Sequence, residues 1–251
     1  MENREFFIDH DGLKLHAKLD FPTREAEKYP VLILGHGYTG HMEEDHLLAA
    51  MQGALDAGYA VLRVELYGHG QSSGLFRDHT ILKWMEEMQT VVEYAAHLPF
   101  ADGIHLSGHS QGGLNALLVG GMEADRLKSL LLLAPATMIR DLARAGWMFE
   151  RQIDPNNIPD VVDMGGGRLL GGSYIRAAQL LPIEDAIDRY QGPVGIIHAI
   201  DDSTVPIACA EMCRDRYKNA MLHVIGGGDH CYVGHEDELR RAVKEFLLMV
   251  R

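Results

Sequence analysis

The chain has 251 residues, of which 47% are hydrophobic and 24% are charged, values that are ordinary for a soluble globular protein. Its formal net charge of −13 at pH 7 argues against nucleic acid and anionic membranes as partners. The first residues lack a basic region followed by an apolar stretch, and no apolar run approaches the roughly 18 residues of a membrane span, so we expect no signal peptide, no membrane span and a cytoplasmic location.

The first part of the chain predicts a hairpin followed by alternating strands and helices. Residues 4–9 and 13–19 alternate in polarity around Asp11-Gly12, a pair that suits a two-residue hairpin turn. The apolar run 31–34 is typical of a strand buried on both faces, and residues 60–66 predict the next strand. Apolar residues at helical spacing predict helices over two further ranges, 45–57 and 81–98.

The same alternation continues toward the C-terminus. Three more buried strands are predicted at 129–133, 194–198 and 221–225. Helices are predicted at 205–217 and at 236–250, the second from an apolar stripe at spacings of three and four. Strands that alternate with helices indicate the α/β class, with a mostly parallel sheet of about eight strands flanked by helices.

One segment, residues 136–182, breaks the alternation because it shows no clean strand. It contains Trp147, Phe149, several prolines and the glycine run 165–167. An insertion this long inside an α/β unit is more often a lid or a binding loop than a simple connection. We therefore predict a core made of residues 1–135 and 183–251 and a lid or cap made of residues 136–182. The alternative is a helical excursion that only packs against the core.

The sequence Gly-His-Ser-Gln-Gly at 108–112 lies between a short apolar run and a helical stretch at 114–119. Strand, G-x-S-x-G and helix in this order form the context of a nucleophile elbow, which exposes a serine hydroxyl on a sharp turn. Glycines on either side have no Cβ, so the strand and the helix can approach closely. We predict Ser110 as a catalytic nucleophile; a chance glycine-rich turn is the alternative.

A serine nucleophile needs a base, and in this type of site the acid and then the histidine follow the serine along the chain. His198 and His223 lie within predicted strands, and His235 begins a predicted helix. His230 follows the strand at 221–225 in a glycine-rich loop, which places its ring at the carboxyl edge of the sheet beside Ser110. We predict His230 as the general base.

The acid and the oxyanion donors are predicted from loops at the same edge. Asp201 and Asp202 follow the strand at 194–198, and either carboxylate could orient the base; we favour Asp202. Asp229 is expected to be a surface or turn residue. The backbone N–H groups of Gln111, directly after the nucleophile, and Tyr38, after the strand at 31–34, are predicted to bind the oxyanion.

With these residues in place, the chain resembles the α/β-hydrolase superfamily over nearly its whole length, and within it the small bacterial cinnamoyl (feruloyl) esterases. The elbow alone is typical of the whole superfamily. The Thr-Gly after His-Gly-Tyr and the sequence Pro-Asn-Asn-Ile-Pro-Asp at 155–160 are more specific for these esterases. The resemblance implies an α/β-hydrolase fold with a lid insertion, and it favours Asp202 over Asp201. The stretches that carry it are 36–40, 108–113, 133–136, 197–202 and 228–231.

The resemblance implies a serine carboxylesterase that hydrolyses hydroxycinnamate or related aryl esters through a Ser-His-Asp triad and an acyl-enzyme. In such esterases an Asp and a Tyr, here Asp141 and Tyr174, hydrogen-bond the phenolic end of the acyl group. Trp147 and Met148 are further expected substrate contacts in an apolar stretch where the family is often polar. That stretch would equally suit a monoacylglycerol or a short-chain acyl ester. A non-catalytic binding protein with this fold is the alternative from another class.

Metal and cofactor chemistry find no support in the sequence. The histidines form no H-E-x-x-H pattern and lie near no cysteine pair with zinc spacing. The glycine runs at 165–167 and 226–228 lack the strand and the GxxxxGK[ST] pattern of a phosphate loop. We therefore expect no metal and no cofactor, with a small-molecule ester as the partner. The resemblance is also compatible with a homodimer.

Overall fold

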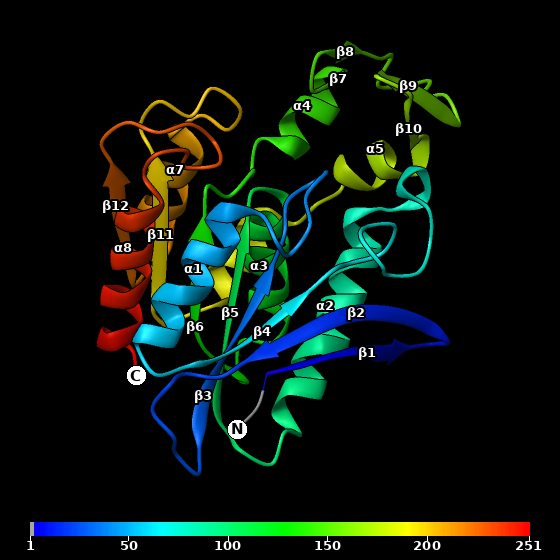
Figure 1. The fold of residues 1–251 in the computed structure, drawn as a ribbon. Coiled ribbons are helices and arrows are strands. Elements are labelled where there is room, and N and C mark those ends of the chain that lie inside the picture. Colours follow the sequence, from blue (N-terminus) through cyan, green and yellow to red (C-terminus); the bar gives the residue numbers. More distant parts are fainter. Residues whose placement is uncertain (1–2) are drawn as a thin grey trace.

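The computed structural model describes residues 3–251. Within these residues, eight strands form one central sheet in the order β1-β2-β4-β3-β5-β6-β11-β12 (Figure 1). The predicted hairpin is confirmed, because β1 (Arg4–His10) and β2 (Leu13–Asp20) pair antiparallel around a turn of Asp11 and Gly12, both with positive φ. β2 also runs antiparallel to its neighbour β4 (Ala60–Val64).

The rest of the sheet is parallel, as the alternation of strands and helices predicts. Its strands are almost fully buried from β4 to β11, which explains their near-continuous apolar sequences. The edge strand β12 (Ala220–Ile225) is partly exposed. The other strands of the parallel part are β3 (Tyr29–Gly35), β5 (Ala101–His109), β6 (Leu127–Leu133) and β11 (Val194–Ala199).

Helices cover both faces of the sheet. On one face α1 (Asp45–Asp56) and α8 (Glu236–Met249) pack against the sheet in one apolar cluster, and the predicted stripe of α8 is buried. The other face is covered by α2 (Ile81–Ala96), α3 (Gln111–Met122), α6 (Ile183–Arg189) and α7 (Ala208–Arg216). The sequence analysis predicts no helix at α6, and α7 begins three residues later than predicted.

Residues 136–182 stand above the carboxyl edge of the sheet (Figure 1). The prediction that this segment contains no strand was wrong. Two small hairpins lie between its short helices, and they are too short for a polarity pattern of period two to reveal them. The elements are α4 (Ile139–Ala145), β7 (Trp147–Met148), β8 (Arg151–Gln152), β9 (Val161–Gly165), β10 (Arg168–Gly171) and α5 (Gly172–Ala178).

The parallel strands place four loops at a common edge. Neighbouring parallel strands end on the same side of a sheet, where α/β proteins bind ligands. The loop after β3 carries Tyr38, the turn after β5 carries Ser110, and the loops after β11 and β12 carry Asp202 and His230. Segment 136–182 follows β6, and the carboxyl end of β6 lies at the same edge of the sheet.

Candidate active site

Ser110 occupies a strained turn between β5 and α3. Its φ of 56° and ψ of −118° lie in a region that non-glycine residues rarely adopt, at a cost of about 1–3 kcal/mol. Two backbone hydrogen bonds hold the turn: the Ser110 N–H donates to Leu133 O at 2.8 Å, and the Ala136 N–H donates to Ser110 O at 3.1 Å. The strain is therefore balanced by the neighbouring strand β6 and the chain that follows it.

The glycines of the motif are required by close backbone contacts. A Cβ on Gly108 would lie 2.2 Å from the carbonyl oxygen of Gly112, and a Cβ on Gly112 would lie 2.3 Å from the carbonyl oxygen of His36. Both distances are far below van der Waals contact, so no side chain fits at either position. The sequence pattern thus follows from the close packing of β5, α3 and the loop after β3.

Asp202 and His230 meet across the loops that follow β11 and β12. The His230 Nδ1 atom lies 2.7 Å from Asp202 Oδ2. The other carboxylate oxygen, Oδ1, accepts the backbone N–H groups of Thr204 and Val205 at 2.8 Å each. A carboxylate can only accept, so the proton of a neutral His230 ring lies on Nδ1 and its Nε2 is free to accept a proton from a serine.

The surroundings of Asp202 keep it ionised. Burial raises its pKa, but the hydrogen bonds from His230, Val205 and Thr204 together hold the pKa below its ordinary value. The Asp202 side chain is fully buried, and a second buried histidine, His198, has its Nε2 atom 3.5 Å from Asp202 Oδ2 and 2.9 Å from Val205 O. The carboxylate therefore lies in a fixed and largely dry environment, which strengthens its effect on the imidazole.

The two residues predicted to supply the oxyanion donors, Gln111 and Tyr38, belong to chain segments that lie close to Ser110. Gln111 begins α3, and the loop after β3 approaches so closely that a Cβ on Gly37 would lie 3.3 Å from Ser110 Cβ. The buried side chain of His36 fixes this loop. Its Nδ1 donates to Gly37 O at 2.8 Å, and its Nε2 accepts the Leu66 N–H at 3.1 Å. Burial lowers the pKa of His36 to about 3, so it remains neutral and keeps both bonds.

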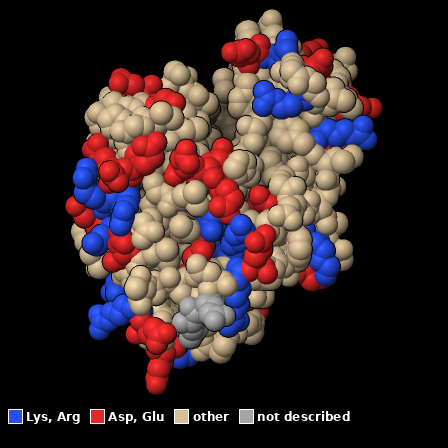
Figure 2. Space-filling view, viewed as in Figure 1, with Lys and Arg blue, Asp and Glu red and all other residues tan. Residues whose placement is uncertain are grey.

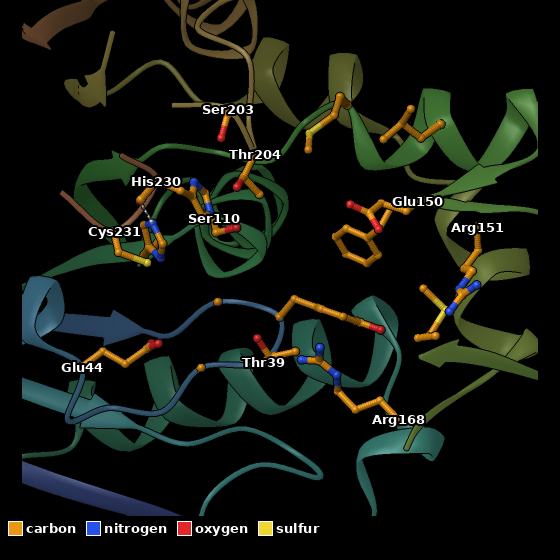
Figure 3. A pocket seen from close by; sticks show the side chains of 18 residues that line it. Thr39, Glu44, Ser110, Glu150, Arg151, Arg168, Ser203, Thr204, His230 and Cys231 are labelled. Atoms are coloured by element: carbon orange, nitrogen blue, oxygen red, sulfur yellow. Dashed lines mark hydrogen bonds between the residues drawn. The ribbon is translucent and has the colours of Figure 1, made fainter. Parts of the chain in front are cut away.

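A cavity of about 690 Å³ opens beside Ser110. Figure 3 shows Ser110 and His230 at one end, with Glu150, Arg151 and Arg168 at the opposite end. Segment 136–182 supplies much of the wall, including four apolar side chains. The cavity is lined by residues 37–40, Glu44, His109, Ser110, Met138, Leu142, Phe149, Glu150, Arg151, Met164, Arg168, Ser203, Thr204, His230 and Cys231.

The predicted substrate contacts lie outside the described residues that line this cavity. Asp141 is exposed on α4 and pairs with Arg140 at 3.0 Å. Tyr174 is fully buried, and its hydroxyl donates to Gln111 Oε1 at 2.6 Å. In β7, Trp147 is 43% exposed and Met148 is buried. The contact of these four side chains with a substrate stays a prediction from the sequence.

The sequence analysis placed Phe149 in the apolar stretch of the insertion, but it did not predict Phe149, Leu142 or Met164 as substrate contacts. Phe149 follows Trp147 and Met148 directly, and only the structure reveals which member of this apolar run faces the cavity. Leu142 and Met164 belong to no sequence motif; Leu142 lies in the short helix α4, and Met164 lies in β9, a strand that the sequence did not predict. An apolar run in an insertion is the one signal that could have indicated this wall.

The surface agrees with a small-molecule site. Figure 2 shows acidic and basic side chains interspersed on the viewed face, with a hollow between segment 136–182 and the rest of the molecule. Within residues 3–251, no helix is both long and apolar enough to cross a membrane.

Comparisons with known proteins agree with this architecture. A family model described as X-Pro dipeptidyl-peptidase (S15 family) matches residues 11–164. Est1E from Butyrivibrio proteoclasticus, solved with bound ferulic acid, is similar at 45% identity and a TM-score of 0.95, over 97% of this chain and 98% of that chain.

More distant relatives share the fold. The monoacylglycerol lipase of Mycolicibacterium smegmatis is 26% identical over 82% of this chain and 81% of its own length. Mouse alpha/beta hydrolase domain-containing protein 10 is 19% identical, with a TM-score of 0.77 over 99% of this chain and 100% of that chain. The chain therefore belongs to the α/β-hydrolase superfamily, matches its S15 family model and falls with Est1E among the small cinnamoyl (feruloyl) esterases that its sequence resembles.

Proposed function

We propose that the protein is a serine carboxylesterase that hydrolyses hydroxycinnamate, feruloyl-type or related aryl esters. The observation that carries the proposal is the contact of His230 with Asp202 beside a strained Ser110, at the end of a cavity whose wall is partly apolar. The similarity to Est1E, which was solved with ferulic acid bound, supports the aryl acyl group. The expected partner is a small-molecule ester, while a homodimer and a cytoplasmic location stay predictions from the sequence.

In the proposed reaction, Ser110 Oγ attacks the ester carbonyl carbon while His230 Nε2 takes the hydroxyl proton. The Tyr38 and Gln111 N–H groups bind the oxyanion of the tetrahedral intermediate, and loss of such a donor typically costs about 3 kcal/mol of barrier. His230 then gives its proton to the alcohol oxygen, and the C–O bond breaks to leave an acyl-enzyme. A water molecule then attacks the acyl carbon while His230 takes its proton. The bond from Ser110 Oγ to the acyl carbon breaks, His230 returns the proton to Oγ, and the acid leaves.

We assign segment 136–182 the role of a lid over this site. Its apolar lining side chains, Met138, Leu142, Phe149 and Met164, face the cavity that Ser110 also lines. An aromatic or aliphatic acyl group buried against them would gain about 25 cal/mol per Å² of apolar surface removed from water. The same cover would keep bulk water from the developing oxyanion, which strengthens the hydrogen bonds that stabilise it.

A monoacylglycerol or a short-chain acyl ester is the second candidate substrate. The apolar lining side chains Leu142, Phe149 and Met164 and the 26% identity to a monoacylglycerol lipase both favour it. The catalytic steps would be the same, so only substrate preference separates the two candidates.

The test is kcat/KM on methyl ferulate against matched aliphatic methyl esters and monoacylglycerols, with Ser110→Ala as the blank. We expect a ferulate preference of about tenfold or more, which corresponds to about 1.4 kcal/mol of transition-state binding. A preference for aliphatic chains would move the assignment to the second candidate. Equal activity of Ser110→Ala, or failure of a fluorophosphonate to label Ser110, would overturn the serine mechanism and favour a binding protein.

A further inference from the structure

A row of three histidines ends at the loop that carries the proposed base. The His109 Nε2 atom lies 2.8 Å from the backbone oxygen of His230, and His109 Nδ1 lies 3.1 Å from His46 Nε2. The rings are also in contact, with centroids 4.5 Å apart for His109 and His230 and 4.2 Å apart for His46 and His109. His46 lies in the first turn of α1, so the row joins α1, the elbow and the loop after β12.

Hydrogen-bond chemistry fixes the protons of this row. A backbone carbonyl only accepts, so His109 must donate through Nε2–H. Both rings are deeply buried. Burial lowers the pKa of His46 to about 4, and it also holds the pKa of His109 well below its ordinary value. In a neutral ring the second nitrogen of His109, Nδ1, is then an acceptor, and His46 donates to it through Nε2–H. The bond to the His230 carbonyl therefore fixes the tautomer of His109, and the tautomer of His109 in turn fixes that of His46.

His109 also directly precedes Ser110 in the chain. Its side chain therefore connects the backbone next to the nucleophile with the backbone of the proposed base, His230. The distance between Ser110 and His230 therefore depends on a side chain that the reaction itself does not use. A displacement of about 1 Å between reacting groups can cost on the order of a hundredfold in rate.

We propose that His109, held in its tautomer by His46, is a positioning residue that sets the place of the His230 imidazole relative to Ser110; this inference rests on the proposed esterase function. The Asp202 contact fixes the orientation of the His230 ring, while His109 bonds the His230 backbone and packs against the same ring. Two independent supports thus fix a histidine that stands on a glycine-rich loop.

The test compares two esters of one acid, methyl ferulate and 4-nitrophenyl ferulate. Methoxide leaves only if His230 protonates it, whereas 4-nitrophenolate leaves without a proton, so a misplaced His230 affects the methyl ester more. We expect His109→Phe to lower kcat/KM for methyl ferulate at least about tenfold more than for 4-nitrophenyl ferulate, with KM nearly unchanged. Fluorophosphonate titration gives the concentration of working sites in each preparation.

Further variants keep the proposal testable if His109→Phe does not fold. His109→Gln keeps a donor and an acceptor and should restore most of the methyl ester activity. His46→Leu should show the same selective loss, and its combination with His109→Phe should be no worse than His109→Phe alone, because His46 acts through His109. The matched control is His105→Leu, another buried histidine of β5, which bonds Ser129 and should affect both esters equally.

Equal losses on the two esters in every His46 and His109 variant would overturn the proposal and indicate a purely structural role. Unchanged activity of His109→Phe would overturn it as well. If the unaltered protein cleaves neither ester, or Ser110→Ala cleaves both, the failure lies in the proposed function rather than in the role of His109.

Discussion

The His230 Nδ1 atom lies 2.7 Å from Asp202 Oδ2, although the two residues are 28 positions apart in the chain. The second oxygen of the same carboxylate is held by the backbone N–H groups of Thr204 and Val205. The carboxylate is therefore fixed by its own loop before it contacts the imidazole. The Asp202 carboxylate sets the tautomer of His230, and the backbone of its own loop holds that carboxylate in place.

Asp202→Asn should lower kcat about 10³- to 10⁴-fold with little change in the free energy of unfolding. The amide oxygen can still accept the Thr204 and Val205 N–H groups, so the loop keeps its shape. The amide nitrogen, however, donates to His230 Nδ1 and forces the ring proton onto Nε2, where it can no longer accept the serine proton. Steady-state kinetics and urea unfolding check the two halves of this prediction.

Asp201→Asn is the matched control, because Asp201 is the exposed neighbour of Asp202 in the same loop. We expect its kcat to stay within about twofold of the unaltered protein, as is usual for surface substitutions without structural roles. A large loss in Asp201→Asn together with a small loss in Asp202→Asn would assign the acid to Asp201 instead.

Tyr38→Phe should stabilise the protein by about 1 kcal/mol and leave kcat within about threefold. The Tyr38 hydroxyl is buried and has no hydrogen-bond partner among the described residues, and such a donor costs about 1–3 kcal/mol. Its ring packs against Phe149 with centroids 4.5 Å apart, a contact that phenylalanine keeps. The proposed oxyanion donor is the backbone N–H of Tyr38, which the substitution does not remove.

Urea unfolding and kcat/KM on methyl ferulate measure both effects for Tyr38→Phe. A loss of more than about tenfold in kcat/KM at unchanged stability would show that the hydroxyl contacts the substrate. Tyr38 would then be a specificity residue in addition to its backbone role.

The sequence carried enough information for the sheet and for the loops at its edge. Buried parallel strands have continuous apolar runs, so β3, β6 and β11 were detectable, and the order of strand, loop and helix placed Ser110, Asp202 and His230 at one edge. The contacts between these side chains depend on loop geometry. No pattern in the sequence indicates that His109 reaches the carbonyl of His230.

The residues that line the cavity wall could not be predicted from the sequence, for a different physical reason. β7 and β8 have two residues each, too few for a periodic pattern, and successive side chains of a strand point to opposite sides. A shift of one residue therefore decides which apolar side chain lines the cavity. The register of β7 and β8 is set by the hairpin turn at Phe149. This residue has a φ of 51° although it is not a glycine, so the sequence does not indicate the turn.

Phe149→Ala should lower kcat/KM for aryl esters about ten- to a hundredfold, mainly through KM. Phe149 lines the cavity and packs on Tyr38, and burial of such a side chain is worth about 1.5–3 kcal/mol. Trp147→Ala is the control, since Trp147 is exposed and lies outside the lining in the described structure. A larger effect of Trp147→Ala would mean that the segment rearranges when substrate binds and that Trp147 contacts it, as the sequence predicted.

Glu87 should make the stability of the protein depend on pH. It is buried in α2, where Oε2 accepts the Tyr67 N–H at 2.8 Å and Oε1 has no hydrogen-bond partner among residues 3–251. Burial raises the pKa of Glu87 to about 7, and the Tyr67 bond opposes this shift only in part. The folded state thus favours the neutral acid. Its contribution to stability is complete below the ordinary pKa near 4.5 and is lost as the pH rises toward 7.

Glu87→Gln removes this loss because glutamine stays neutral at every pH and can still accept the Tyr67 N–H. The free energy of unfolding of the variant, relative to the unaltered protein, should therefore rise by about 2–3 kcal/mol between pH 5 and pH 8. Urea unfolding at several pH values measures the difference, and any constant offset from the new amide cancels. Glu86→Gln, at the exposed neighbouring position, should give no such slope. A constant difference for Glu87→Gln across this range would show that Glu87 is already ionised in the folded protein at pH 5.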